Sequence, residues 1–303
     1  MRHSLQDRKM QEYSKLGWIG LGVMGSAMCQ HLMAAGNSMS VNTRSYNKAA
    51  KLLDAGAVWC DSAAEVAAHS DVVFTMVGVE EEVREVYFSA SGLFANEISG
   101  KIFVDMGTTA PGLTLELSAH AQQHDAYFID APVSGGDVGA RNASLSIMAG
   151  ADPETLEDVR PLLESLGRVQ LMGSPGSGQH TKMCNQIVVA GTMIGVCEAL
   201  VYASNTGLDC EKLIATISQG AAGCWALDNL APRIITQDFT PGFMVDHFIK
   251  DLGIAVKETE MMGVKLPGLE LAKSLYERVS NMGHGKSGTQ ALTLALQDLA
   301  HSE

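Results

Sequence analysis

One lysine stands where it could transfer a proton. Lys182 follows the Gly-Ser-Gly segment at 176–178 and precedes an apolar run from Ile187 that is typical of a buried helix. On such a helix Lys182, Asn185 and Gln186 occupy positions i, i+3 and i+4 and share one face. Partial burial lowers the pKa of a lysine, which suits it to general acid/base catalysis near neutral pH. Taken alone, the segment fits a solvated lysine on an exposed first turn equally well.

A glycine-rich turn directly follows the first apolar run, Leu16–Ile19. It reads Gly-Leu-Gly-Val-Met-Gly at 20–25 and leads into a helix-like segment at 26–35. The first glycine permits a tight turn, the second lets a pyrophosphate approach the backbone, and the third allows the helix to pack closely on the strand. The N-terminus of the helix then favours phosphate. We expect a dinucleotide to contact Gly20, Leu21, Gly22, Val23, Met24 and Gly25.

The end of the second expected strand, Ser38–Asn42, indicates which dinucleotide binds. An acidic residue about 20 positions past the glycines would bind the 2′-hydroxyl of NAD. This chain instead carries a guanidinium and hydroxyls there, which suit the 2′-phosphate of NADP. The residues concerned are Asn42, Thr43, Arg44 and Ser45, with Lys48 nearby. The sequence therefore predicts NADP, with NAD possible; the alternative is an exposed arginine on a loop.

Two further tracts could contact substrate or cofactor. Asp-Ala-Pro-Val-Ser-Gly-Gly at 130–136 follows the expected strand Tyr127–Asp130, and ligands of open α/β sheets bind beyond the carboxyl ends of strands. Its hydroxyl and successive backbone N–H groups suit a carboxylate, although the string by itself also fits a tight turn. The residues of this cradle are Ser134, Gly135 and Gly136. The other tract is Phe-Ile-Lys-Asp-Leu at 248–252, where Lys250 and Asp251 are expected to begin a helix, as a solvated turn also would.

These residues must be positioned by a folded scaffold, and the sequence pattern predicts two domains. Short apolar runs alternate with amphipathic segments as far as residue 171, which predicts an α/β, Rossmann-type doubly wound sheet. The expected strands are Leu16–Ile19, Ser38–Asn42, Val72–Val77, Ile102–Asp105, Tyr127–Asp130, Ser144–Ala149 and Val169–Leu171. Met76 and Val77, at the end of their strand, are expected to contact the cofactor. The helices expected between the strands are Ala49–Ala55, Glu80–Phe88, Leu113–Gln123 and Glu154–Leu166.

After Pro175 the strand signals stop and the helical period continues to the end of the chain. A long helix over 178–206, ended by Gly207, is expected to join the two domains. The other helices expected in this half are Cys210–Gln219, Leu227–Ile235, Ile249–Met262 and Leu269–Gly283. We therefore predict a flexible N-terminal arm (1–14), a cofactor-binding Rossmann domain (15–176) and an all-α C-terminal domain for substrate binding and oligomerisation (177–303).

Composition narrows the class of protein. The 303 residues carry a net charge of −13, with 46% apolar and 18% charged residues, which is ordinary for a soluble two-domain enzyme and argues against nucleic acid or an anionic membrane as a partner. No apolar run approaches the ~20 residues of a membrane span, and the first 14 residues lack signal or transit features, so a cytoplasmic location is expected. The six cysteines show no C-x-x-C pair, which predicts reduced thiols and no metal site.

The tracts together resemble those of the β-hydroxyacid dehydrogenase family, which includes 3-hydroxyisobutyrate dehydrogenase, tartronate semialdehyde reductase and the glyoxylate/succinic semialdehyde reductases. The resemblance runs from about Leu16 to the last helix. It rests on G-L-G-V-M-G at 20–25, D-A-P-V-S-G-G at 130–136, G-x-G-x-x-x-K-x-x-N at 176–185 and K-D-L at 250–252.

The resemblance implies a role for individual residues. Lys182 would be the catalytic lysine, Asn185 would orient the substrate, and Ser134–Gly136 would grip its carboxylate. Lys250 would reach the nicotinamide side of the cleft, with Thr108 and Asp251 as further cofactor contacts. A homodimer or homotetramer, assembled through the helical domain, is also implied. One departure is Gly107, which stands where the family usually has a serine near the nicotinamide ribose.

The function predicted from the sequence is an NADP-preferring oxidoreductase. It would interconvert a small 3-hydroxy acid and its semialdehyde, with hydride transfer to or from the nicotinamide and proton transfer by Lys182. One alternative is a non-catalytic dinucleotide-binding module, which is expected to lose the proton-transfer group. A second is an imine reductase on the same scaffold, which typically replaces the lysine. The presence of Lys182 and Asn185 favours a carbonyl substrate over both alternatives.

Overall fold

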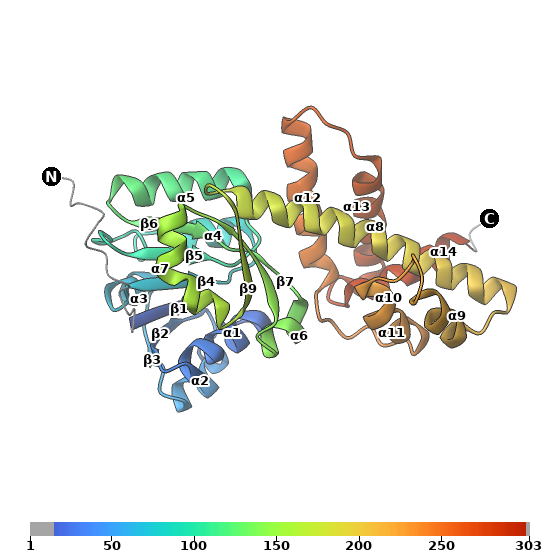
Figure 1. Cartoon of the computed structure of the whole chain (residues 1–303), viewed down its shortest axis with the longest axis horizontal. Helices are drawn as coiled ribbons and strands as arrows, with labels where there is room; N and C mark the ends of the chain where they lie inside the picture. Colours follow the sequence, from blue (N-terminus) through green and yellow to red (C-terminus); the bar gives the residue numbers. More distant parts are fainter. Residues whose placement is uncertain (1–14, 301–303) are drawn as a thin grey trace. The chain divides into compact units, whose positions relative to one another are not determined.

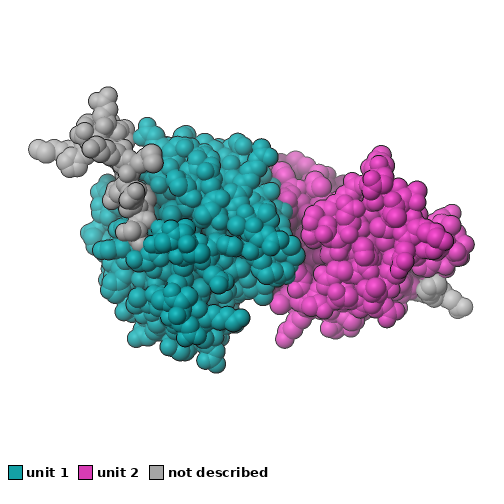
Figure 2. Space-filling view, turned by 60° about the horizontal axis from the view of Figure 1, so that its bottom comes forward, with its two compact units in different colours: residues 1–182 teal, residues 183–303 magenta. Residues whose placement is uncertain are grey.

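The computed structural model describes residues 15–300, so the expected N-terminal arm lies outside the described residues. The chain divides into two compact units after Lys182, shown in different colours in Figure 2. Unit 1 (residues 1–182) contains the β-sheet, and unit 2 (residues 183–303) is helical (Figure 1). Each unit has a hydrophobic core of its own.

Unit 1 is built on a 9-stranded sheet, which confirms the predicted doubly wound α/β class. Six parallel strands come in the spatial order β3, β2, β1, β4, β5, β6, which is the order of dinucleotide-binding folds, with its switch point between β1 and β4. These strands are β1 (Lys15–Ile19), β2 (Ser38–Asn42), β3 (Val58–Trp59), β4 (Val72–Thr75), β5 (Ile102–Asp105) and β6 (Tyr127–Asp130).

The sheet continues past β6 with a change of direction. β8 (Leu145–Gly150) runs antiparallel to both β6 and β7 (Val133–Ser134), whereas β9 (Gly167–Gly173) runs parallel to β8. Every strand expected from the sequence is present, but β3 and β7 were not predicted. Each has only two residues, which is too short for an alternating pattern to show. β4 also ends two residues earlier than expected, so Met76 and Val77 lie beyond the strand.

Helices connect the strands of unit 1 and flank its sheet (Figure 1). They are α1 (Val23–Ala34), α2 (Ala50–Asp54), α3 (Ala63–Ala68), α4 (Glu80–Phe88), α5 (Pro111–Gln123), α6 (Gly136–Arg141) and α7 (Pro153–Glu164), with a short 3₁₀ turn, η2 (Tyr46–Lys48). The six-residue helices α3 and α6 were not predicted, because neither is long enough to show a helical period.

Unit 2 is all helical in its described part, as predicted. α8 (Ser177–Thr206) begins in unit 1 and continues into unit 2. It is followed by α9 (Cys210–Ile217), α10 (Trp225–Asn229), α11 (Ala231–Ile235), α12 (Val245–Met261), α13 (Pro267–Val279), η3 (Ser280–His284), η4 (Thr289–Ala291) and α14 (Leu292–Ala300). α8 ends as predicted at Gly207, which has φ 73°. Leu208 N–H bonds the Ala203 carbonyl there at 3.0 Å, closing a Schellman motif.

Two helical predictions in unit 2 need correction. The expected helix Leu227–Ile235 is two short helices, because Pro232 has no N–H to donate and its ring obstructs the preceding turn. α12 begins at Val245, so Lys250 and Asp251 lie in its second turn and do not begin a helix.

The long helix α8 also corrects the expectation about apolar runs. By length and composition it could cross a membrane, since it has 30 residues and contains an 18-residue stretch of mean hydropathy 1.8. In the structure 33% of that stretch is buried. Scattered polar residues such as Asn185 and Thr192 interrupt the apolar run in the sequence, although the helix as a whole is apolar. The core helix of a soluble protein passes the same test, so α8 alone does not indicate a membrane protein.

Candidate active site

The glycine turn after β1 is shaped by close backbone contacts. Gly20 has φ 94°, and a Cβ there would lie 2.3 Å from the Met76 carbonyl oxygen. A Cβ on Gly25 would lie 2.0 Å from the Gly20 carbonyl oxygen, so α1 packs against the turn without room for a side chain. At Gly22, by contrast, a Cβ would meet no atom within 4 Å. The turn is therefore tight where it packs and open at the start of α1, where a pyrophosphate needs access.

Arg44 lies at the end of β2, but it already has an acidic partner. Its Nη1 is 2.6 Å from Glu82 Oε1, and its side chain is 82% exposed. Glu82, on α4, also accepts a hydrogen bond from Gly78 N–H at 3.2 Å. A 2′-phosphate bound by Arg44 would compete with this carboxylate. Sequence reasoning missed Glu82, because it lies 38 positions from Arg44 and on another element.

The other residues expected to select the cofactor face different partners. Thr43 Oγ1 accepts a long, 3.5 Å hydrogen bond from Leu21 N–H, linking the end of β2 to the glycine turn. Asn42 Nδ2 donates to the Cys60 carbonyl at 2.8 Å, so its side chain joins β2 to the end of β3. Ser45 is exposed and precedes η2.

Gly107, the departure from the family pattern, has a packing reason. A Cβ at this position would lie 2.7 Å from the Val77 carbonyl oxygen, so a serine needs the backbone around Val77 to move. The Gly107 N–H donates to Asp105 Oδ1 at 3.1 Å, and its carbonyl accepts from Gln179 Nε2 at 2.9 Å. Thr108, next in the chain, is half-buried. The segment between β5 and α5 is thus fixed by a buried polar network.

Asp105 is the centre of that network and is fully buried. Its carboxylate accepts hydrogen bonds from the hydroxyl groups of Thr75 at 3.0 Å and Thr109 at 2.6 Å. Thr109 N–H donates in turn to Gln179 Oε1 at 3.0 Å. Gln179 belongs to the first turn of α8, so the network fastens the beginning of that helix to the ends of β4 and β5.

Asp130 fastens the same helix from β6. Its two carboxylate oxygens accept hydrogen bonds from Gly176 N–H and Gln179 N–H, each at 2.8 Å. Burial raises the pKa of Asp130 to about 6, although these two hydrogen bonds oppose the rise. Gly178 lets the first turn of α8 lie close to the backbone of β8, because a Cβ there would lie 2.3 Å from the Met148 carbonyl oxygen. Asp130 therefore caps α8 and fixes the position of the turn that carries Lys182.

Lys182 is buried, with 7% of its surface exposed. Its Nζ donates a 2.8 Å hydrogen bond to the carbonyl of Val133, the residue before Ser134. Gly135 and Gly136 have φ 132° and 63°, a backbone that favours glycine and turns the chain from β7 into α6. The structure thus brings the ammonium group next to the expected carboxylate cradle. A solvated lysine on an exposed turn is excluded.

The expected residues of unit 2 form a hydrogen-bonded chain. Asn185 Nδ2 donates to Gln186 Oε1 at 2.8 Å, and Gln186 Nε2 donates to Asp251 Oδ2 at 2.6 Å. The Lys250 ammonium lies 2.9 Å from Asp251 Oδ1. Asp251 is only 2% exposed, so its carboxylate holds Lys250 and Gln186 from within unit 2. This arrangement fixes the orientation of the Asn185 amide and the Lys250 ammonium.

Comparison with known proteins covers almost the whole chain. Residues 15–185 match the family model described as the NAD binding domain of 6-phosphogluconate dehydrogenase. Residues 176–296 match the model described as the NAD-binding region of NADP-dependent 3-hydroxyisobutyrate dehydrogenase.

Several individual proteins are similar over nearly their full length. A probable 3-hydroxyisobutyrate dehydrogenase-like protein of Arabidopsis thaliana is 48% identical, over 94% of this chain and 86% of that one. The 2-hydroxy-3-oxopropionate reductase of Escherichia coli is 36% identical, over 95% and 98%. The structure of Mycobacterium tuberculosis 3-hydroxyisobutyrate dehydrogenase with L-serine has a TM-score of 0.85 at 31% identity, over 94% and 99%. A structure of Psf3 with NADP+ and 2-OPP has a TM-score of 0.86 at 28% identity, over 93% and 99%.

Proposed function

This chain belongs to the β-hydroxyacid dehydrogenase family, and from that membership and the site we propose an NADP-preferring oxidoreductase that interconverts a small 3-hydroxy acid and its semialdehyde. At the coarser level the chain is an NAD(P)-dependent hydroxyacid dehydrogenase with a Rossmann domain. The observation that carries the finer proposal is the buried Lys182 ammonium beside the Ser134–Gly136 turn.

The dinucleotide would be held by the glycine turn of unit 1. Gly20, Gly22 and Gly25 would receive the pyrophosphate at the start of α1, and Arg44 would bind the 2′-phosphate after leaving Glu82. When bound, the nicotinamide supplies or accepts the hydride. The tight packing of Met76 against Gly20 and the open space at Gly22 support this assignment.

Ser134, Gly135 and Gly136 would bind the substrate carboxylate through the serine hydroxyl and backbone N–H groups. Lys182 would give its proton to the carbonyl oxygen during reduction and take it back from the hydroxyl during oxidation. Its hydrogen bond to Val133 O would orient the ammonium group before substrate binds. Asn185, oriented by Gln186 and Asp251, would help to place the reacting oxygen.

The two alternatives are less well supported. A cofactor-binding module without catalysis gives no reason to bury a lysine, or to fix the start of its helix through Asp130 and the Asp105 network. Imine reduction on this scaffold typically dispenses with the lysine, which this chain retains. Both considerations favour a carbonyl substrate.

We also propose that the protein is a homo-oligomer. Val188 and Tyr202, large side chains on α8, are 67% and 69% exposed in the single chain, which is a surface that a partner subunit would cover. Size-exclusion chromatography with light scattering would measure the molar mass directly. A monomer at micromolar concentration would contradict this part of the proposal.

A substrate screen tests the proposed activity. Purified enzyme would be given NADPH and either glyoxylate or the semialdehyde of methylmalonate, tartronate or succinate, with butyraldehyde as the control without a carboxylate. We expect at least one acid to be reduced and butyraldehyde to be a poor substrate, because it leaves the donors of the cradle unpaired. Equal rates for butyraldehyde and succinic semialdehyde would refute the carboxylate assignment.

A further inference from the structure

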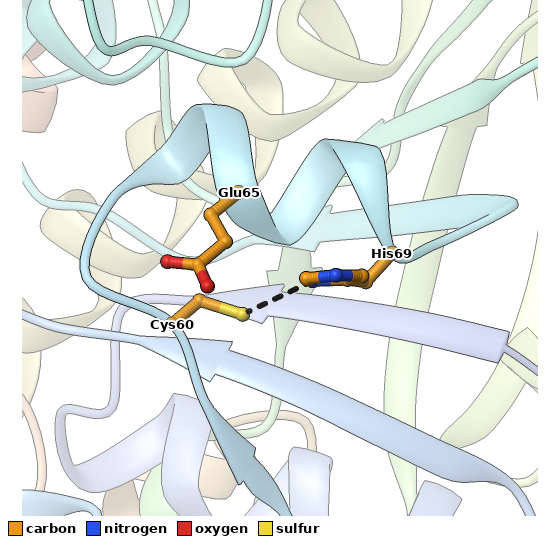
Figure 3. A group of neighbouring side chains, drawn as sticks. All are labelled: Cys60, Glu65 and His69. Carbon is orange, nitrogen blue, oxygen red and sulfur yellow. Dashed lines mark hydrogen bonds between the residues drawn. The ribbon is translucent and has the colours of Figure 1, made fainter.

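Three side chains of different chemistry converge at the end of the edge strand β3. The Cys60 sulfur, a carboxylate oxygen of Glu65 and a ring nitrogen of His69 lie within 4.8 Å of one another (Figure 3). Cys60 Sγ is 3.9 Å from His69 Nδ1. None of these residues belongs to the proposed catalytic site, and the sequence pattern C-x4-E-x3-H is not one of the familiar zinc spacings.

The local fold holds the three groups in place. The backbone of Cys60 is fixed on both sides, since its N–H donates to Val41 O at 3.0 Å and its carbonyl accepts from Asn42 Nδ2 at 2.8 Å. Ser62 caps α3 by accepting from Glu65 N–H at 3.1 Å. Glu65 lies in the first turn of α3, and His69 follows four residues later at the C-terminal end of the helix, so the two share one face. Both side chains point towards the sulfur (Figure 3).

Helix capping explains only part of this arrangement. Glu65 Oε2 accepts a 2.7 Å hydrogen bond from Asp61 N–H, which closes the first turn of α3. A carboxylate has further lone pairs, so this bond does not prevent it from binding a cation. Capping does not require a histidine ring nitrogen facing a buried sulfur, and a thiol is a weak hydrogen-bond donor.

The charges around the sulfur favour a cation. The Glu65 carboxylate places a negative charge close to the Cys60 sulfur. A bound divalent ion deprotonates a coordinating thiol outright, so the thiolate would add a second negative charge to the site. The cluster also has an open side, since Cys60 is buried, Glu65 half-buried and His69 exposed.

We propose that Cys60, Glu65 and His69 bind one Zn²⁺ ion per chain, with water as the fourth ligand. Thiolate, imidazole and carboxylate are the ligands that zinc prefers. Bonds of about 2.3 Å to sulfur and 2.0 Å to nitrogen, at a tetrahedral angle, separate these two atoms by roughly 3.5 Å. The observed separation is 3.9 Å, so a small rotation of the exposed His69 side chain would complete the geometry. On binding, the S–H proton leaves to solvent as the S–Zn bond forms.

Cobalt provides the most specific test, because Co²⁺ occupies zinc sites and a Co²⁺–thiolate bond gives intense charge-transfer absorption in the near ultraviolet. Full-length protein without a histidine tag would be titrated with Co²⁺ and then with Zn²⁺. We expect the band to saturate at one Co²⁺ per chain and to disappear as Zn²⁺ displaces it. Calorimetry of Zn²⁺ binding in two buffers of different ionisation enthalpy should show proton release on binding.

Variants assign the signal to the cluster. Cys60→Ser should abolish the band, and His69→Gln should weaken Co²⁺ and Zn²⁺ binding by at least about tenfold. Cys210→Ser, which removes a partly exposed cysteine of unit 2, should leave both unchanged. Should Cys60→Ser fail to fold, His69→Gln remains informative because His69 is exposed. Absence of the band in the wild type, or its persistence in His69→Gln at full affinity, would overturn the proposal.

Discussion

The ion pair between Arg44 and Glu82 makes a quantitative prediction about cofactor choice. The two side chains are 2.6 Å apart, yet Arg44 is 82% exposed, so the pair itself contributes about 0–1 kcal/mol to stability. Glu82→Gln should leave the fold intact, because the amide oxygen can still accept the Gly78 N–H. It should also free Arg44 for a phosphate and remove a negative charge beside the expected 2′-phosphate.

The size of the effect follows from Coulomb's law at a solvated surface. One unit of charge about 4 Å from another interacts by about 1 kcal/mol in water. Glu82→Gln should therefore tighten NADPH binding by about fivefold and leave NADH nearly unchanged. Arg44→Ala should act in the opposite direction and weaken NADPH by about tenfold or more, because it removes a charge-assisted hydrogen bond.

Fluorescence titration of both cofactors against the wild type and each variant would measure these dissociation constants. Glu81→Gln, which removes a neighbouring exposed carboxylate of α4, is the matched control for a general change in charge. The double variant Arg44→Ala/Glu82→Gln should show a smaller gain from Glu82→Gln than the wild-type background does. Equal affinity of the wild type for NADPH and NADH, or a Glu82→Gln variant that binds NADPH less tightly, would refute the reasoning.

Three further predictions follow from the buried contacts. The folded pKa of Asp130, about 6, lies above its ordinary value of 3.8, so its ionised form destabilises the fold. Between pH 4 and 7 the wild type should therefore lose about 2 kcal/mol of unfolding free energy relative to Asp130→Asn. Urea denaturation across this range would measure the difference, and a difference that does not change with pH would contradict the reasoning. Gly135→Ala places a Cβ at φ 132° and should raise KM for the acid about tenfold or more while the Kd for NADPH stays within about twofold; a cofactor effect of equal size would contradict the assignment. Gly107→Ser should destabilise the fold by about 1–3 kcal/mol, because the serine Cβ would clash with the Val77 carbonyl oxygen. An unchanged Tm would contradict this and show that the backbone around Val77 moves at little cost.

The fold was largely predictable because its signals are local. A glycine turn after an apolar run, alternating elements as far as residue 171 and uninterrupted helical period afterwards are properties of neighbouring residues. Gly207 as the end of α8 is another local signal. The two-residue strands β3 and β7 and the short helices α3 and α6 escaped, since none contains a full period of its pattern.

The supports of the candidate site were less predictable because they are distant in sequence. Asp130 caps a helix turn 46 to 49 residues further along the chain, and the Gly107 segment is held by Gln179, 72 residues away. Glu82 meets Arg44 only after folding brings the first turn of α4 within reach of the loop that follows β2. No fixed sequence spacing identifies such pairs in advance. The residue types of the site could be identified from the sequence, but not the contacts that orient them.

The most direct test of the central claim is single-turnover reduction of the best semialdehyde by NADPH in the wild type and in Lys182→Ala. Loss of the proton donor should slow the reaction about 10²–10⁴-fold, while the dissociation constant of NADPH stays near its wild-type value because the glycine turn is untouched. Lys182→Arg should recover little, since a guanidinium does not give up its proton near neutral pH. A Lys182→Ala enzyme that reacts within a few-fold of the wild-type rate would contradict the proposed mechanism.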